Sequence, residues 1–164
     1  MEDKKNKNSE FTQKKIKYAN YQIVFREIPE EITLAINISN CPNNCKGCHS
    51  SYLQQDIGIE LTEYSLKKLI ENHKGITCVC FMGGDLFPKE LNKLAFYILQ
   101  NYKGLKVGVY SGLNLINPEL IPALFDYIKV GEYIEDLGPL SSPKTNQILF
   151  KTTIKFEDIT NKVK

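Results

Sequence analysis

Three thiols and one imidazole lie close together in the segment CPNNCKGCHS, which spans residues 41–50. The chain has five cysteines, and this segment contains Cys41, Cys45 and Cys48, followed directly by His49. Thiols and imidazoles at such short spacings bind metals or carry out redox reactions. Four kinds of chemistry fit them: a redox-active dithiol, covalent attachment of a haem, a zinc site and an iron–sulfur site.

The dithiol and haem interpretations use only part of the segment. Cys45 and Cys48 match a dithiol motif, and with His49 they match a haem-attachment motif, but neither interpretation gives Cys41 a role. Zinc bound by three thiolates and one imidazole is chemically adequate. However, adjacent residues such as Cys48 and His49 rarely both reach one ion. Three thiolates in one loop favour an iron–sulfur cluster with one iron left open to a substrate or cofactor, and zinc stays the alternative.

Composition limits the class of protein. The chain has 164 residues, 42% of them hydrophobic, which is enough for one well-buried core. Its net charge is +2. The first seventeen residues are polar and rich in lysine (Lys4, Lys5, Lys7, Lys14, Lys15 and Lys17). They contain no apolar segment of the signal-peptide type, and no later run is long enough to span a membrane. We therefore expect a cytoplasmic protein that does not bind membranes.

The basic opening raises the question of nucleic-acid binding. It has no arginine and few aromatic residues. We therefore expect residues 1–20 to form a flexible, solvated tail, and we expect no nucleic-acid partner.

Hydrophobic periodicity predicts alternating strands and helices. Strands are expected at 31–39, 76–82, 105–110 and 127–131, and helices at 62–75, 88–104 and, as a short one, 117–127. This alternation indicates an α/β fold whose parallel strands are joined by right-handed crossovers. Since a complete (β/α)₈ barrel needs about 250 residues, we expect a partial TIM-like barrel of parallel strands with covering helices. It would form one domain at 21–150, followed by a C-terminal extension at 151–164.

Four segments with candidate ligand-binding groups follow the predicted strands. They are the cysteine loop, Gly83-Gly84-Asp85, Tyr110-Ser111-Gly112 and Lys129-Val130-Gly131. Because parallel strands end at one edge, which is where α/β proteins bind ligands, we expect these segments to meet there. Paired glycines allow a backbone to approach a ligand closely. Cys78 and Cys80 lie on one face of a predicted strand and are interpreted as core residues.

The motif Cys41-x-x-x-Cys45-x-x-Cys48 resembles the cysteine loop of radical S-adenosylmethionine enzymes. MGGDLFP at 82–88 is similar to the Gly-Gly-Glu-Pro segment of that family. The cysteine segment, VYSG and YIKVGEYIEDLGPLSSPKTNQILF look like the glycyl-radical activating proteins of anaerobic ribonucleoside-triphosphate reductase. The resemblance runs from about Tyr21 to Phe150. Two positions depart from the family: Asp85 stands where Glu is usual, and Ile148 stands where Arg is common.

The resemblance implies cofactors and roles for particular residues. Cys41, Cys45 and Cys48 would hold a [4Fe–4S] cluster, and S-adenosylmethionine would complete the coordination of its fourth iron. The residues expected to contact the cofactor are Gly47, Cys48, His49, Gly83, Gly84, Asp85 and Ser111.

The same resemblance implies a reaction. The reduced cluster would cleave S-adenosylmethionine to a 5′-deoxyadenosyl radical, which would take a hydrogen from a glycine of the reductase. The partners would be the catalytic subunit of anaerobic ribonucleoside-triphosphate reductase and an electron donor such as flavodoxin or ferredoxin. The rival enzyme acts on a small molecule or on another glycyl-radical enzyme. The rival from another class is a non-catalytic module that binds zinc or a cluster.

Overall fold

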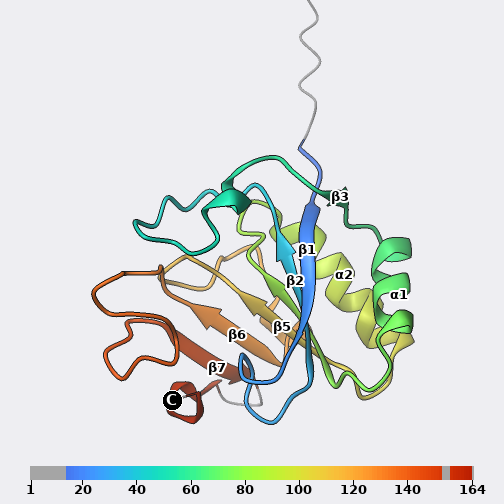
Figure 1. Cartoon of the computed structure of the whole chain (residues 1–164). Coiled ribbons are helices and arrows are strands. Elements are labelled where there is room, and N and C mark those ends of the chain that lie inside the picture. The colour runs from blue at the N-terminus through green and yellow to red at the C-terminus, as the bar shows by residue number, and fades with distance from the viewer. Residues whose placement is uncertain (1–13, 153–155, 164) are drawn as a thin grey trace, which may run out of the picture.

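The computed structural model describes residues 14–152 and 156–163 (Figure 1). Lys4, Lys5 and Lys7 of the expected basic tail therefore lie outside the described residues, whereas the residues from Lys17 to Asn20 belong to the first strand. The strands are β1 (Lys17–Val24), β2 (Thr33–Ile38), β3 (Ile59–Glu60), β4 (Cys78–Met82), β5 (Lys106–Tyr110), β6 (Tyr127–Val130), β7 (Ile148–Thr152) and β8 (Phe156–Asp158). The α-helices are α1 (Glu63–Asn72) and α2 (Pro88–Asn101), and the 3-10 helices are η1 (Ser51–Gln54), η2 (Pro122–Leu124) and η3 (Thr160–Lys162).

One mixed sheet organises the described residues, in the order β3-β1-β2-β4-β5-β6-β7-β8. The four strands predicted from the sequence are its centre, and β2, β4, β5 and β6 pair in parallel. β1 and β3 on one side, and β7 and β8 on the other, pair antiparallel. The description of this sheet as a partial TIM-like barrel stays a prediction.

The two longer predicted helices are present, and local signals explain their ends. Thr62 caps α1 through a capping box in which Thr62 and Ser65 exchange hydrogen bonds between side chain and backbone. Pro88 occupies the first turn of α2, where its missing N–H costs nothing. Both helices pack on the same face of the sheet (Figure 1).

The third predicted helix, at 117–127, is wrong: only the short 3-10 helix η2 forms there. Pro122 has no N–H and disfavours helical geometry at the residue before it, and Ile121 is extended, with φ −100° and ψ 97°. The N–H of Ile121 donates instead to Oδ1 of Asn92 in α2, at 2.9 Å. The periodic apolar residues of this segment therefore pack against α2 as a loop.

The central strands bury side chains on both faces, which is typical of parallel sheets. Val79 and Phe81 of β4 belong to the core under the helices. Cys78 and Cys80 point to the other face and belong to a second core with residues of the loop after β1 and of the C-terminal segment. Both thiols are fully buried, which confirms their interpretation as core residues.

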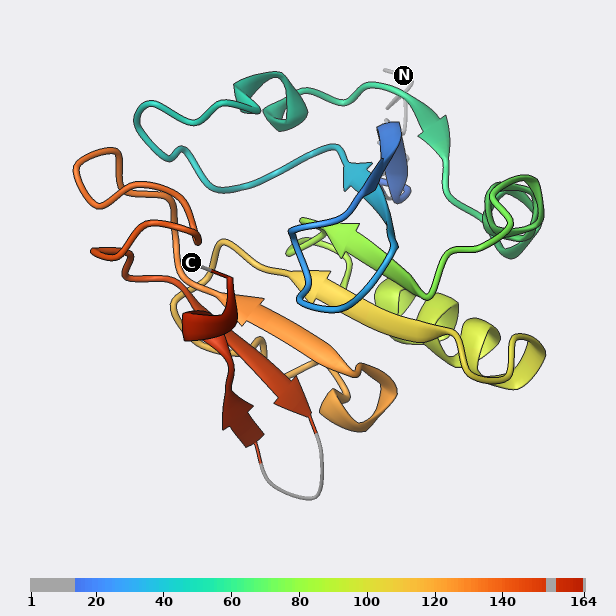
Figure 2. The same ribbon diagram turned by 60° about the horizontal axis from the view of Figure 1, so that its bottom comes forward.

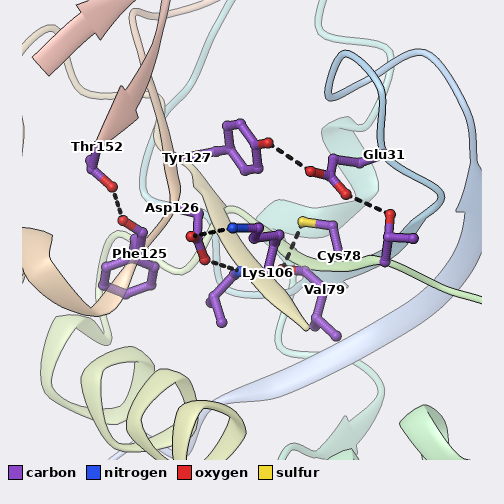
Figure 3. A network of polar contacts seen from close by, with 10 residues as sticks. Glu31, Cys78, Val79, Lys106, Phe125, Asp126, Tyr127 and Thr152 are labelled. Carbon is purple, nitrogen blue, oxygen red and sulfur yellow. Dashed lines mark hydrogen bonds and ion pairs between the residues drawn. The ribbon is translucent and has the colours of Figure 1, made fainter. Parts of the chain in front are cut away.

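Polar contacts fasten the amino-terminal ends of the parallel strands (Figure 3). The hydroxyls of Tyr127 and Thr77 donate to the two carboxylate oxygens of Glu31, at 2.7 and 2.5 Å. The carboxylate of Asp126 accepts from the N–H of Val107 at 2.9 Å and pairs with Lys106. These contacts lie at the edge opposite the loop of Cys41, Cys45 and Cys48. Among the described residues, no helix is long and apolar enough to cross a lipid bilayer.

Candidate metal and cofactor site

A cavity of about 330 Å³ lies at the carboxyl ends of the parallel strands. The segments predicted to meet at this edge do meet there. The cavity is lined by the three clustered cysteines and His49, by Gly83 and Asp85 after β4, by Ser111 and Gly112 after β5, and by Lys129 of β6. Its remaining lining includes Glu27, Met82, Tyr110, Leu53, Leu140 and Gln147.

Backbone contacts hold the cysteine loop in place. The N–H of Cys41 donates to the carbonyl of Leu53, at 2.9 Å, so that η1 closes the loop behind the thiols. The N–H of Cys48 donates to the carbonyl of Cys45, at 3.3 Å. All three thiols are free and partly exposed, in contrast to the buried Cys78 and Cys80. They are the cysteines that a bound group in the cavity can reach.

The electrostatics of the thiols favour a positively charged partner. Burial raises the pKa of the Cys41 thiol, and the negative charges of Asp85, Cys45 and Cys48 raise it further. Three neighbouring thiolates are therefore unstable together unless cations bind them. Burial also raises the pKa of the Cys78 and Cys80 thiols well above the usual value, which suits inert core residues.

The three clustered thiols line one cavity and can supply ligands to a metal centre. A zinc site needs its ligands to converge on one point, whereas an iron–sulfur cluster takes its thiolates on separate irons. In the described ranges, no three His, Cys, Asp or Glu side chains are gathered closely enough to hold one metal ion.

The paired glycines after β4 have different surroundings. Both have left-handed backbone conformations, with φ 97° at Gly83 and 95° at Gly84. Gly83 lines the cavity, whereas a Cβ at Gly84 would lie 3.0 Å from a methyl carbon of Leu91 in α2. The conformation explains the glycine at both positions. The contact of Gly84 with a cofactor stays a prediction.

The segment between β6 and β7 lies beside the cysteine loop, and the two segments are neighbours in both views (Figures 1 and 2). The rings of Tyr133 and His49 are 5.6 Å apart. A Cβ at Gly47 would lie 2.8 Å from the carboxyl carbon of Glu135. Gly47 and His49 are therefore exposed residues that contact this segment, and His49 also lines the cavity.

Sequence reasoning placed the segment Lys129-Val130-Gly131 at this edge but did not single out Lys129 as a residue of the site. Only 8% of this lysine is exposed, and its ammonium donates to the carbonyls of Ser111, at 3.1 Å, and Gly131, at 2.7 Å. Burial lowers the pKa of Lys129 to about 8, while electrostatic interactions with Asp85, Cys45, Cys80 and Cys41 oppose this effect. Tyr127 and Lys129 alternate with Ile128 in a parallel strand that is buried on both faces. A charged residue in the middle of a strand that is buried on both faces is a signal that could have identified this position from the sequence.

A comparison with protein families agrees with this geometry. Residues 31–137 match the model of the 4Fe-4S single cluster domain, and the match includes all three clustered cysteines. The chain belongs to this family of iron–sulfur domains. No curated protein and no solved structure matches it.

Proposed function

We propose that the protein is a radical S-adenosylmethionine enzyme that generates a glycyl radical on anaerobic ribonucleoside-triphosphate reductase. The observation that carries the proposal is the set of three accessible thiols around one cavity in a 4Fe-4S domain. Cys41, Cys45 and Cys48 would hold the cluster. Since the other two cysteines are buried in the core, one iron of the cluster would lack a thiolate and stay open to a cofactor.

The charges in the cavity suit the amino-acid part of S-adenosylmethionine. The carboxylates of Glu27 and Asp85 complement an ammonium group, and the buried ammonium of Lys129 complements a carboxylate. Met82 and Tyr110 offer apolar surface beside them. These groups would orient the cofactor and exclude water around it. The cluster, when reduced, would supply the electron that cleaves the sulfonium and yields a 5′-deoxyadenosyl radical.

A protein substrate is supported by the resemblance of the segments around Tyr133 and Asn146 to activating proteins of that reductase. The segment between β6 and β7 flanks the cysteine loop, so a docked partner would contact both. An activator releases its target after one hydrogen abstraction, and we therefore expect a small interface of the transient type.

The test is a reaction of the reduced, cluster-loaded protein with S-adenosylmethionine and the catalytic subunit of the reductase from the same organism. We expect a glycyl-radical doublet in the electron paramagnetic resonance (EPR) spectrum and one 5′-deoxyadenosine for each radical formed. Changing the radical glycine of the reductase to alanine should remove the doublet. Turnover of S-adenosylmethionine with a metabolite, and no doublet with the reductase, would favour the small-molecule enzyme instead.

A further inference from the structure

The carboxylate of Asp85, which lines the cavity, accepts three hydrogen bonds. The Oγ of Ser111 donates to its Oδ1, at 2.6 Å. The N–H of Gly112 and the Nδ2 of Asn43 both donate to its Oδ2, at 3.0 and 2.7 Å. Two of these donors belong to the segment after β5, and the third belongs to the cysteine loop. Asp85 therefore joins the loops that follow β2, β4 and β5.

Asn43 is the residue through which the cysteine loop is held. It lies midway between Cys41 and Cys45 in the sequence. Its carbonyl accepts a weak hydrogen bond from the Sγ of Cys41, at 3.8 Å, and another from Nε2 of Gln54, at 3.4 Å. A movement of the Asn43 side chain would therefore displace the backbone between Cys41 and Cys45.

The glycine at 112 provides an independent sign of this contact. A Cβ at Gly112 would lie 2.3 Å from Nδ2 of Asn43, a separation that two such atoms cannot adopt. The segment after β5 therefore leaves open the space that the Asn43 amide occupies. Ser111, the neighbour of this glycine, is itself buried, and its carbonyl accepts from Lys129.

We propose that Asp85 is a positioning residue, which acts through Asn43 to hold the cysteine loop in the conformation that binds the cluster. This role requires only the 4Fe–4S cluster and is independent of S-adenosylmethionine and of the reductase. It also gives a reason for aspartate at this position. A glutamate carboxylate would stand one methylene further from the backbone and would displace the donors that Asp85 now bonds.

The sharpest variant is Asn43→Asp, because it keeps the size of the side chain and places two carboxylates against each other. The variant loses a hydrogen bond to a charged group and gains the repulsion between two carboxylates, and both effects release the loop. We therefore expect the reconstituted variant to lose iron to a chelator about ten times faster than the wild type, or more. The EPR spectrum of its reduced cluster should broaden, because the cysteine loop would no longer have a single conformation.

A paired substitution tests whether the two positions act through each other. Combining Asn43→Asp with Asp85→Asn restores an amide–carboxylate hydrogen bond between the positions, although the N–H of Gly112 loses its acceptor. We expect this double variant to retain iron better than Asn43→Asp alone. Asn44→Asp is the matched control, since it makes the same change of charge at an exposed position of the same loop, and it should retain iron like the wild type.

Two further variants separate this role from a contact with the cofactor. Asp85→Glu and Gly112→Ala, tested without S-adenosylmethionine, should both lose iron faster than the wild type, and a cooperative thermal unfolding transition should show that both variants are folded. Iron retention equal to that of the wild type in Asn43→Asp and Asp85→Glu would overturn the proposal. So would a double variant that loses iron as fast as Asn43→Asp alone.

Discussion

The Cys45→Ala protein, reconstituted anaerobically, is expected to bind no cluster, whereas the wild-type chain should bind about four irons. Cys45 lines the cavity with Cys41 and Cys48, and no other accessible thiol is available to replace it. Two thiolates are too few to hold a cluster against solvent. Iron analysis and the visible absorption of the reconstituted protein measure the loss directly.

The matched control uses the two cysteines of the core. Replacing both Cys78 and Cys80 by alanine should leave the iron content unchanged, at a cost in stability of about 1 kcal/mol for each sulfur atom removed from the core. Full retention of iron in Cys45→Ala would contradict the assignment of the ligands. Stoichiometric zinc in the wild-type protein, with no iron bound after reconstitution, would favour the non-catalytic zinc module.

Lys129→Met is expected to change the pH dependence of the stability of the metal-free protein. The folded pKa of Lys129, about 8, lies below its usual value of 10.5 because burial disfavours the charged form. The cost of this buried charge is present below about pH 8 and disappears as pH rises toward 10.5. Between these values, the free energy of unfolding of the wild type should rise relative to the variant by about 3 kcal/mol.

Urea denaturation of both proteins at several pH values measures this difference. Lys106→Met is the control, because Lys106 begins the neighbouring strand β5, pairs with Asp126 at the opposite edge and is about half-exposed. The free energy of unfolding of Lys106→Met should differ from that of the wild type by the same amount at every pH in this range. A difference in unfolding free energy between the wild type and Lys129→Met that stays constant with pH would contradict the claim that the Lys129 ammonium is buried.

The same substitution should affect the loaded protein. The ammonium of Lys129 shares the cavity with the thiolates, and Cys41 and Cys45 act on it electrostatically. A positive charge there stabilises the reduced, more negative cluster. An interaction on the order of 1 kcal/mol corresponds to on the order of 50 mV for one electron, so the potential of Lys129→Met should be lower by about that amount.

The central features of the fold were predictable because they depend on local patterns. Alternating apolar residues at β2 and the apolar runs at β4, β5 and β6 predict strands, and the direction of parallel strands then places their loops at one edge. The antiparallel strands were missed because β1 has no fully buried residue and mixes polar with apolar side chains, and β7 follows a long segment without regular structure. The prediction of a helix at 117–127 was wrong although the apolar residues have helical spacing. Pro122 disfavours a helix there, and the N–H of Ile121 bonds to Asn92 instead of to a helical carbonyl.

The candidate site also combines features that a local sequence pattern predicts with features that depend on tertiary contacts. The thiols were visible in the sequence because their spacing alone indicates a metal centre. The hydrogen bonds of Asp85 with Asn43 and Ser111 depend on three loops that are distant in the sequence, and no local pattern reports them. The burial of Lys129 likewise depends on the packing of both faces of the sheet.

The central claim is that the cluster of this protein leaves one iron open to S-adenosylmethionine. The most direct measurement is the EPR spectrum of the reduced, reconstituted protein before and after S-adenosylmethionine is added, with 5′-deoxyadenosine quantified in the same sample. We expect the signal of the cluster to shift on addition and 5′-deoxyadenosine to accumulate in the wild type. An unchanged signal from a fully loaded cluster, with no 5′-deoxyadenosine formed, would contradict the claim.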